Sequence, residues 1–260
     1  MQERHSDRSQ YFNEQTTTVK DFIFPMISKY KNIDSSISVL EVGCGYGGNL
    51  VPFIEAGCQV TGIDLLEDSI ETAKIELDEA NTPNLTLIAS DIYKVTGMEN
   101  KFDVIFMKDT LEHIPNQEKL IPFLKTFLKD DGIMFQGFPP WRNPFGGHQQ
   151  MSKSKFLSRL PWFHVSPRFM FKGILKMFGE TPQKIEGFME GVYDTRISIQ
   201  RFRRIIRKNG FVIKERTHYF INPNYQIKFG LKPRVLWKVL DIPWFRDWWT
   251  TTCYYVLAKK

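Results

Sequence analysis

Residues 38–50 read SVLEVGCGYGGNL, a short apolar run followed directly by a glycine-rich loop. Val39, Leu40 and Val42 predict a buried strand, and residues 49–55 predict the helix that leaves the loop. Glycines allow the backbone to turn tightly and to approach a bound molecule closely. A glycine loop that faces a helix N-terminus is typical of a site for a nucleotide-like ligand.

The spacing of the glycines alone leaves the ligand open. Gly43, Gly45 and Gly48 match the dinucleotide pattern G-x-G-x-x-G, while the first two with Gly47 match a tighter G-x-G-x-G. An acid, Glu41, stands at the end of the predicted strand. A bound pyrophosphate would make a further negative charge unfavourable there, so Glu41 favours a ligand without a pyrophosphate.

Acids also follow the next two predicted strands. Asp64 follows the apolar run 59–63, at a position suited to hydrogen-bonding a ribose diol. Ser90-Asp91-Ile92 follows the run 85–89, where a polar side chain can meet an adenine edge. Each acid alone is equally well explained as a solvated loop residue. Together they predict one site, because doubly wound sheets bind ligands at the carboxyl ends of their strands.

These strand-end residues resemble those of the class I S-adenosylmethionine-dependent methyltransferases, over residues 37–138 and more weakly over 198–260. The resemblance implies an α/β fold: a doubly wound, mostly parallel, seven-stranded Rossmann-like sheet with helices on both faces and an inserted lid. It also implies that S-adenosyl-L-methionine is the cofactor. The residues implied to bind this cofactor are Glu41, Gly43, Gly45, Asp64, Leu65, Asp91, Ile92, Met107 and Lys108.

Residues 102–114 resemble the fourth strand and following loop of the small-molecule branch, and are similar to quinone O-methyltransferases. That branch usually has an acidic or small residue where this chain has Lys108, so we expect only the Lys108 backbone to contact the cofactor. The similarity also allows Glu112 and His113 to help bind a divalent cation. Two adjacent residues do not make a coordination sphere, and we assign no metal site.

Methyl transfer to an alcohol or phenol benefits from a base that takes the acceptor's proton. His148 is our first candidate, because Gly146 and Gly147 before it would let the loop close over the substrate. His113 and Asp109, which follow the fourth predicted strand, are the other candidates. A hydrogen-bonded structural role explains His148 equally well.

The composition predicts one soluble enzyme domain with an insertion. The 260 residues are 42% hydrophobic, which is ample for one large core. The three cysteines are unevenly spaced and form no C-x-x-C, so we expect neither a disulfide framework nor a zinc site. Residues 1–8 lack the apolar core of a signal peptide, and no run of about eighteen apolar residues occurs. We therefore expect a cytoplasmic protein that does not span a membrane.

The sequence pattern divides the chain into a cap, a core and an insert. Residues 1–36 predict an N-terminal helical cap with a helix near 17–27, and 37–138 with 197–260 predict the Rossmann-like core. Residues 139–196 interrupt the alternation and predict a lid over the substrate. Further core strands are predicted at 133–138, 211–217 and 253–258, and core helices at 69–80, 117–128 and 197–208.

Charge is unevenly distributed. Residues 151–260 contain 22 Lys and Arg against 7 Asp and Glu, whereas residues 1–150 contain 13 against 22. The acidic half suits a sulfonium cation, and the basic half suggests an anionic partner or lipid surface. Residues 168–178 predict a basic amphipathic helix, which either packs on the core or contacts the inner face of a membrane.

The sequence therefore predicts a methyltransferase that acts on a small or amphiphilic acceptor, at oxygen. An RNA methyltransferase is an alternative because of the basic half, and it would need exposed Arg and Lys beside stacking aromatics. A non-catalytic adenosylmethionine-binding regulatory protein is a second alternative, and a dehydrogenase a more distant one. The oligomeric state and the acceptor's identity stay open.

Overall fold

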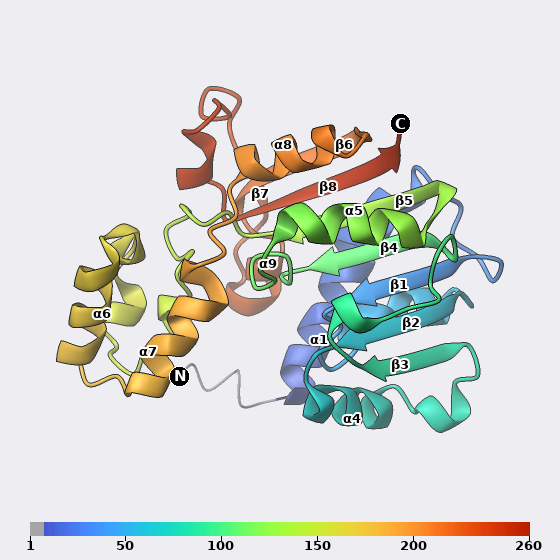
Figure 1. The fold of residues 1–260 in the computed structure, drawn as a ribbon, viewed down its shortest axis with the longest axis horizontal. Coiled ribbons are helices and arrows are strands. Elements are labelled where there is room, and N and C mark those ends of the chain that lie inside the picture. The colour runs from blue at the N-terminus through green and yellow to red at the C-terminus, as the bar shows by residue number, and fades with distance from the viewer. Residues whose placement is uncertain (1–7) are drawn as a thin grey trace.

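The computed structural model describes residues 8–260 and shows a central eight-stranded sheet with helices on both faces (Figure 1). The strand order is β3-β2-β1-β4-β5-β8-β6-β7, in which β1 to β5 pair in parallel and β8, β6 and β7 are antiparallel. This confirms the predicted doubly wound α/β class, with eight strands where seven were predicted. The strands are β1 Ser38–Val42, β2 Gln59–Asp64, β3 Leu85–Ala89, β4 Phe102–Lys108, β5 Leu128–Phe138, β6 Phe211–Ile221, β7 Arg234–Val235 and β8 Thr252–Lys259.

Helices cover both faces of the sheet, and an apolar cluster fills each interface. On one face Leu124 and Phe202 of α5 and α8 pack with residues such as Tyr255 of β8. On the other face Ile27 and Phe53 of α2 and α3 pack with β1 and β4. Strand β4 is buried along its whole length, as expected for a parallel strand covered on both sides. The helices are α1 Arg8–Thr18, α2 Phe24–Ser28, α3 Val51–Glu55, α4 Glu67–Glu76, α5 Gln117–Phe127, α6 Arg168–Met177, α7 Pro182–Phe188, α8 Ile199–Lys208 and α9 Asn224–Phe229.

The N-terminal helical segment is longer than the predicted helix near 17–27. Helix α1 continues through a π-helical turn, Val19–Ile23, into α2. The Thr16 hydroxyl donates a 2.8 Å hydrogen bond to the carbonyl of Gly48, so α1 is tied directly to the glycine loop. The signal-peptide prediction rests on residues 1–8, of which 1–7 lie outside the described residues.

Three further predicted boundaries are wrong. The strand predicted at 133–138 begins in the structure at Leu128. The strand predicted at 211–217 continues to Ile221. The predicted helix 69–80 ends in the structure at Glu76, because Asp78 adopts a left-handed conformation with φ of 47°. Helices α7 and α9 and the short strand β7 were not predicted.

Residues 139–196 have an apolar core of their own. Phe171 and Leu175 of α6 pack with Phe188 of α7 and with Trp141 and Tyr193. This unit lies beside the ends of the strands toward which the arrows of β1 to β4 point, with α6 at the left edge of Figure 1. Phe171 and Leu175 of α6 are thus buried within the insert, and the role of the insert as a lid stays a prediction. No helix in residues 8–260 has the length and apolar character needed to cross a bilayer.

Candidate functional site

The glycine loop is fixed to the end of β2 by backbone and carboxylate hydrogen bonds. The amide of Gly43 donates to the carbonyl of Ile63 at 2.7 Å. One Asp64 oxygen accepts from the Gly45 amide at 2.9 Å, and the other accepts from the Leu66 amide at 3.0 Å. Asp64 therefore holds the glycine loop and the segment before α4 in one arrangement.

A first cavity of about 480 Å³ opens at the carboxyl ends of β1 to β4. Five residues predicted to bind the cofactor line it: Gly43, Asp64, Leu65, Asp91 and Ile92. The wall combines apolar surface with convergent carboxylates, which suits a nucleoside. The other lining residues are Val42, Ile63, Leu66, Ser90, Tyr93, Asp109, Thr110, His113, Ile114 and Pro115.

A second cavity of about 320 Å³ shares Gly43, Asp64, Leu66 and Asp109 with the first, so the two cavities meet at these residues. Gly45 and Lys108 also line this second cavity. Helix α1 contributes two residues that the sequence analysis missed, Tyr11 and Gln15, and Tyr46 and Ser69 complete the wall.

Gln15, which lines the second cavity, carries a buried acceptor atom without a hydrogen-bond donor in the part of the chain that the structure describes. Among the described residues, the side-chain oxygen of Gln15 is buried and has no hydrogen-bond partner. A buried acceptor without a donor is costly. This oxygen lies toward Gly48, 3.0 Å from the place of a Cβ atom on that glycine. The polar residues Gln15, Ser69, Lys108 and Asp109 on the wall suit the polar end of a ligand whose nucleoside fills the first cavity.

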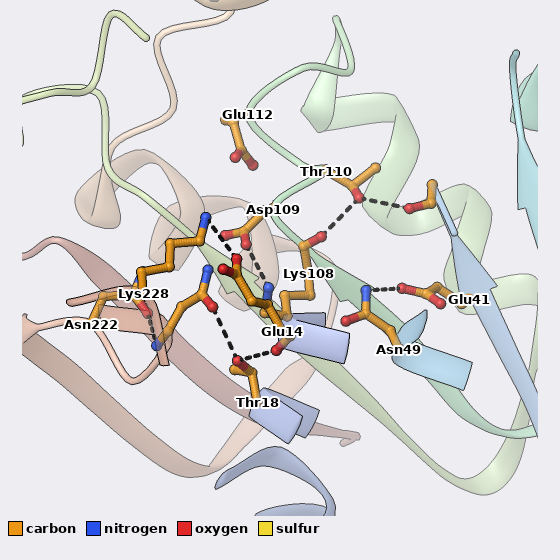
Figure 2. Close-up of polar contacts among 12 residues, drawn as sticks. Glu14, Thr18, Glu41, Asn49, Lys108, Asp109, Thr110, Glu112, Asn222 and Lys228 are labelled. Atoms are coloured by element: carbon orange, nitrogen blue, oxygen red, sulfur yellow. Dashed lines mark hydrogen bonds and ion pairs between the residues drawn. The ribbon is translucent and has the colours of Figure 1, made fainter. Parts of the chain in front are cut away.

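Lys108 and Asp109 form an ion pair of 2.7 Å at the end of β4 (Figure 2). Burial lowers the pKa of Lys108, but the charge of Asp109 and the proximity of Tyr11 outweigh it and raise that pKa overall. Burial likewise opposes ionisation of Asp109, and Lys108 overcomes it, so the pKa of Asp109 is lowered. The pair is therefore ionised. Lys108 lines the second cavity, and the expectation that only its backbone contacts the cofactor stays a prediction.

Glu41 and Met107, both predicted to bind the cofactor, line neither of these two cavities. They are fully buried. One Glu41 oxygen accepts a hydrogen bond of 2.7 Å from the Asn49 side chain (Figure 2). Burial raises the pKa of Glu41 to about 8, and Asn49 and Lys108 oppose this only in part. Glu41 thus binds Asn49, in the turn Gly48–Leu50 that follows the glycine loop, and touches neither cavity.

The raised pKa of Glu41 predicts a pH dependence of folding stability. Because the folded-state pKa is about 8 against 4.5 for an ordinary glutamate, the stabilising contribution is complete below pH 4.5 and is lost as the pH rises through 8. Glu41→Gln keeps a neutral side chain and the acceptor for Asn49. We expect thermal unfolding at pH 5 and pH 8 to show a steeper loss of stability for the wild type than for Glu41→Gln. Parallel pH profiles would contradict this assignment.

The structure brings the three candidate catalytic residues together. The ring centroids of His113 and His148 lie 4.9 Å apart, edge to face. The charge of His148 helps to lower the pKa of Asp109. His113 and Asp109 line the first cavity, and His148 lines a third cavity of about 400 Å³. The two histidines therefore stand between the first and third cavities.

His148 is held in a strained conformation with φ of 53°, and Asp109 has φ of 52°. Positive φ in residues other than glycine is uncommon and is concentrated at functional sites. A Cβ atom on Gly147 would lie 2.2 Å from the Cβ of His164, so this glycine is required by close packing. The close packing of Gly147 thus indicates a fixed loop rather than a mobile one. In this loop His148 already lies beside His113, with no movement of the loop.

Glu112 lies beside the two histidines and is buried. Burial raises its pKa well above the ordinary value, and the charge of Asp109 adds to this effect. Ligand atoms of Glu112, His113 and His148 lie within 4.8 Å of one another. The structure thus adds His148 to the two residues that the sequence offered for a cation, and the assignment of no metal site stays a prediction.

Two glycines with positive φ allow a matched test of the cavity wall. Gly43 has φ of 77°, and a Cβ atom on it would lie 2.3 Å from the Thr110 side chain. Gly97 has φ of 70°, has no atom within 4 Å of such a Cβ, and lines neither cavity. Both alanine variants carry the conformational cost of about 1–2 kcal/mol, and only Gly43→Ala adds a collision. We expect calorimetry to show weaker adenosylhomocysteine binding for Gly43→Ala than for Gly97→Ala, and equal affinities would contradict this.

Residues 33–162, half of the chain, match the family model described as a methyltransferase domain. Ubiquinone biosynthesis O-methyltransferases of Albidiferax ferrireducens and Actinobacillus pleuropneumoniae are 34% and 35% identical to this chain, each over 37% of it. (S)-Coclaurine N-methyltransferase of Papaver somniferum is 28% identical over 48% of the chain. The matches span 39%, 43% and 37% of these relatives, less than half of their length.

Solved structures share the fold at low identity. Magnesium protoporphyrin IX methyltransferase of Synechocystis with bound adenosylhomocysteine matches with a TM-score of 0.56 and 18% identity, over 95% of this chain and 84% of that one. Geranyl diphosphate C-methyltransferase of Streptomyces coelicolor matches with a TM-score of 0.59 and 12% identity, over 91% and 79%. These likenesses show a common fold.

Proposed function

This chain belongs to the methyltransferase domain family, and from that premise we propose that it transfers a methyl group from S-adenosyl-L-methionine to an oxygen of a small or amphiphilic acceptor. One observation carries the proposal: the His113–His148 pair stands between a nucleoside-sized cavity and a further, largely apolar one. A donor in the first cavity and an acceptor in the third would meet at this pair. The names of the ubiquinone O-methyltransferases support oxygen as the receiving atom.

The residues present fit this cofactor. Asp64 offers carboxylate oxygens to the ribose hydroxyls, and Leu65 and Ile92 offer apolar surface to the adenine. In the second cavity, Asp109 suits the amino group of the methionine end, and Lys108 suits its carboxylate. When bound, the cofactor supplies a methyl group made electrophilic by its sulfonium.

Side chains of this protein would then take up the proton that the acceptor's hydroxyl loses. The Nδ1 of His113 lies 3.0 Å from the Gly191 carbonyl, which can only accept, so this nitrogen donates. Burial lowers the pKa of His113, and the ring is therefore neutral. His148 faces the third cavity and takes the acceptor's proton, and the nearby Asp109 carboxylate stabilises the imidazolium that forms.

The RNA alternative has one observation in its favour. Arg203, Arg204 and Arg207 of α8 line a hollow of about 610 Å³ together with Trp244, a combination that can bind a nucleic acid strand. This hollow shares no lining residue with the three cavities described above. It therefore offers a binding surface without a route to the histidine pair.

Incubation of the protein with methyl-labelled donor and fractionated lipid, polar-metabolite and RNA pools tests the proposal. We expect label in an organic-extractable product whose methyl group resists mild alkali, as an ether does. Label in RNA would favour the alternative. Tight adenosylhomocysteine binding with no labelled product from any pool would identify a non-catalytic regulatory protein.

We also propose that residues 231–245 contact an anionic lipid surface. Trp237, Val239 and Trp244 are 63%, 74% and 60% exposed, which is unusual for side chains of this size. Lys232, Arg234 and Lys238 interleave with them. Exposed tryptophans between basic residues suit the interface of a bilayer.

Helix α6 also exposes two large apolar side chains, Phe169 and Met177. Two basic residues of this helix, Arg168 and Lys172, form ion pairs with acids of the insert.

Cosedimentation with vesicles tests this contact. We expect binding to vesicles that contain phosphatidylglycerol and about tenfold or more weaker binding for the double variant Trp237→Ala and Trp244→Ala, because each side chain loses burial in lipid. Ile75→Ala, which removes another strongly exposed apolar side chain on α4, serves as control. Equal binding of wild type and double variant would contradict the proposal.

A further inference from the structure

The third cavity lies between the insert and α9, and four large apolar or aromatic side chains form one part of its wall. Phe145 and Met151 come from the insert, and Tyr225 and Phe229 come from α9. The rings of Tyr225 and Phe229 lie 5.4 Å apart, edge to face. Such a wall accepts an apolar body. The remaining lining residues are His148, Gln150, Ser158, Arg159 and Lys228.

The same wall carries two cations and, among the described residues that line it, no acid. Arg159 is exposed at the cavity, and within residues 8–260 no carboxylate lies within 4.0 Å of its guanidinium. Lys228 is mostly buried, and its ammonium lies 3.6 Å from Glu14 (Figure 2). The charges of Glu14 and Asp109 both act on Lys228, so the positive potential in the cavity comes chiefly from Arg159, which has no such neighbour within residues 8–260.

Lys228 also connects this cavity to the donor side. Its ammonium lies 5.9 Å from the centre of the Tyr11 ring, and Tyr11 lines the second cavity. Burial lowers the pKa of Lys228, while Glu14 opposes that effect. An anion bound in the third cavity would stabilise the charged form of this partly desolvated lysine.

We propose that the acceptor is an amphiphile that carries an anionic oxygen group, a carboxylate or a phosphate, and that Arg159 and Lys228 hold this group while its apolar body lies on Phe145, Tyr225 and Phe229. The inference rests on the proposed function. A guanidinium binds planar or tetrahedral oxyanions through two parallel hydrogen bonds, which orients them as well as attracting them. His148 on the same wall then faces the hydroxyl that receives the methyl group.

Displacement of a fluorescent fatty acid tests this inference without any turnover. The probe is dansylaminoundecanoate, compared with its neutral carboxamide, on wild-type protein saturated with adenosylhomocysteine. We expect the acid to bind about tenfold or more tightly than the amide. Arg159→Gln should remove that preference with little effect on the amide, and Arg159→Lys should restore part of it. Lys155→Gln, a nearby exposed cation that does not line the cavity, should change nothing.

Two competitors identify the anionic group, because dodecanoate and dodecyl phosphate differ only in the oxyanion. Stronger displacement by one of them identifies that group as the preferred one.

Equal binding of acid and amide, or an acid preference that survives Arg159→Gln, would overturn the inference. If the acid binds selectively but no pool accepts labelled methyl, the anion site stands and the proposed function fails.

Discussion

Replacement of His148 by alanine is expected to lower the single-turnover rate of methyl transfer by about 100-fold or more, with affinity for adenosylhomocysteine nearly unchanged. The reason is geometric: His148 lines the third cavity and contacts His113, but it lines neither the first nor the second cavity. The wild-type rate should rise with pH as an imidazole loses its proton. The variant should lack that rise. Rapid-quench measurement with labelled donor at several pH values checks both expectations.

Gln150→Ala provides the matched control, because Gln150 lines the same third cavity two residues away. It should leave the rate within a fewfold of the wild type. A His148→Ala variant with lowered thermal stability but intact single-turnover transfer would mean that His148 is structural. In that case His113 and Asp109, which line the donor cavity, become the next candidates for the base.

Asp64→Ala should weaken adenosylhomocysteine binding by about 1.5–3 kcal/mol, through the loss of a charge-assisted hydrogen bond to the ribose. In the structure the same carboxylate also accepts from the amides of Gly45 and Leu66, so its removal loosens the loop as well. We therefore expect an effect near the upper end of that range. Calorimetric titration of the folded variant provides the measurement.

Asp68→Ala is a suitable control for Asp64→Ala, since Asp68 is an exposed acid in the first turn of α4 and lines neither donor cavity. Its affinity for adenosylhomocysteine should equal that of the wild type. An unchanged affinity of Asp64→Ala would remove Asp64 from the site. Tighter binding of NAD than of adenosylhomocysteine by the wild type would overturn the choice of cofactor.

The strand ends could be predicted from the sequence because each is a local pattern. Gly43, Asp64 and Asp91 each follow a short apolar run, and parallel strands bring their carboxyl ends to one edge of the sheet. Residues that reach the cavities from distant elements left no such pattern. Gln15 comes from α1 and Lys228 from α9, and only the packing of these helices brings them to the site.

The insert was the least predictable part, because its core is built from short 3₁₀ turns and two helices rather than from a repeating pattern. A start signal for α7 was nevertheless present. Thr181 caps the helix by accepting from the Lys184 amide, and Pro182 occupies the first helical position. The sequence also suggested mobility from Gly146 and Gly147, whereas both are buried and Gly147 packs against His164.

A crystal structure of the complex with adenosylhomocysteine tests most directly whether donor and acceptor sites meet at the histidine pair. We expect the ribose hydroxyls against Asp64, the methionine end beside Gln15 and Lys108, and the sulfur facing the side on which His113 and His148 lie. A nucleoside bound outside the first cavity, or a sulfur that faces away from both histidines, would contradict this expectation.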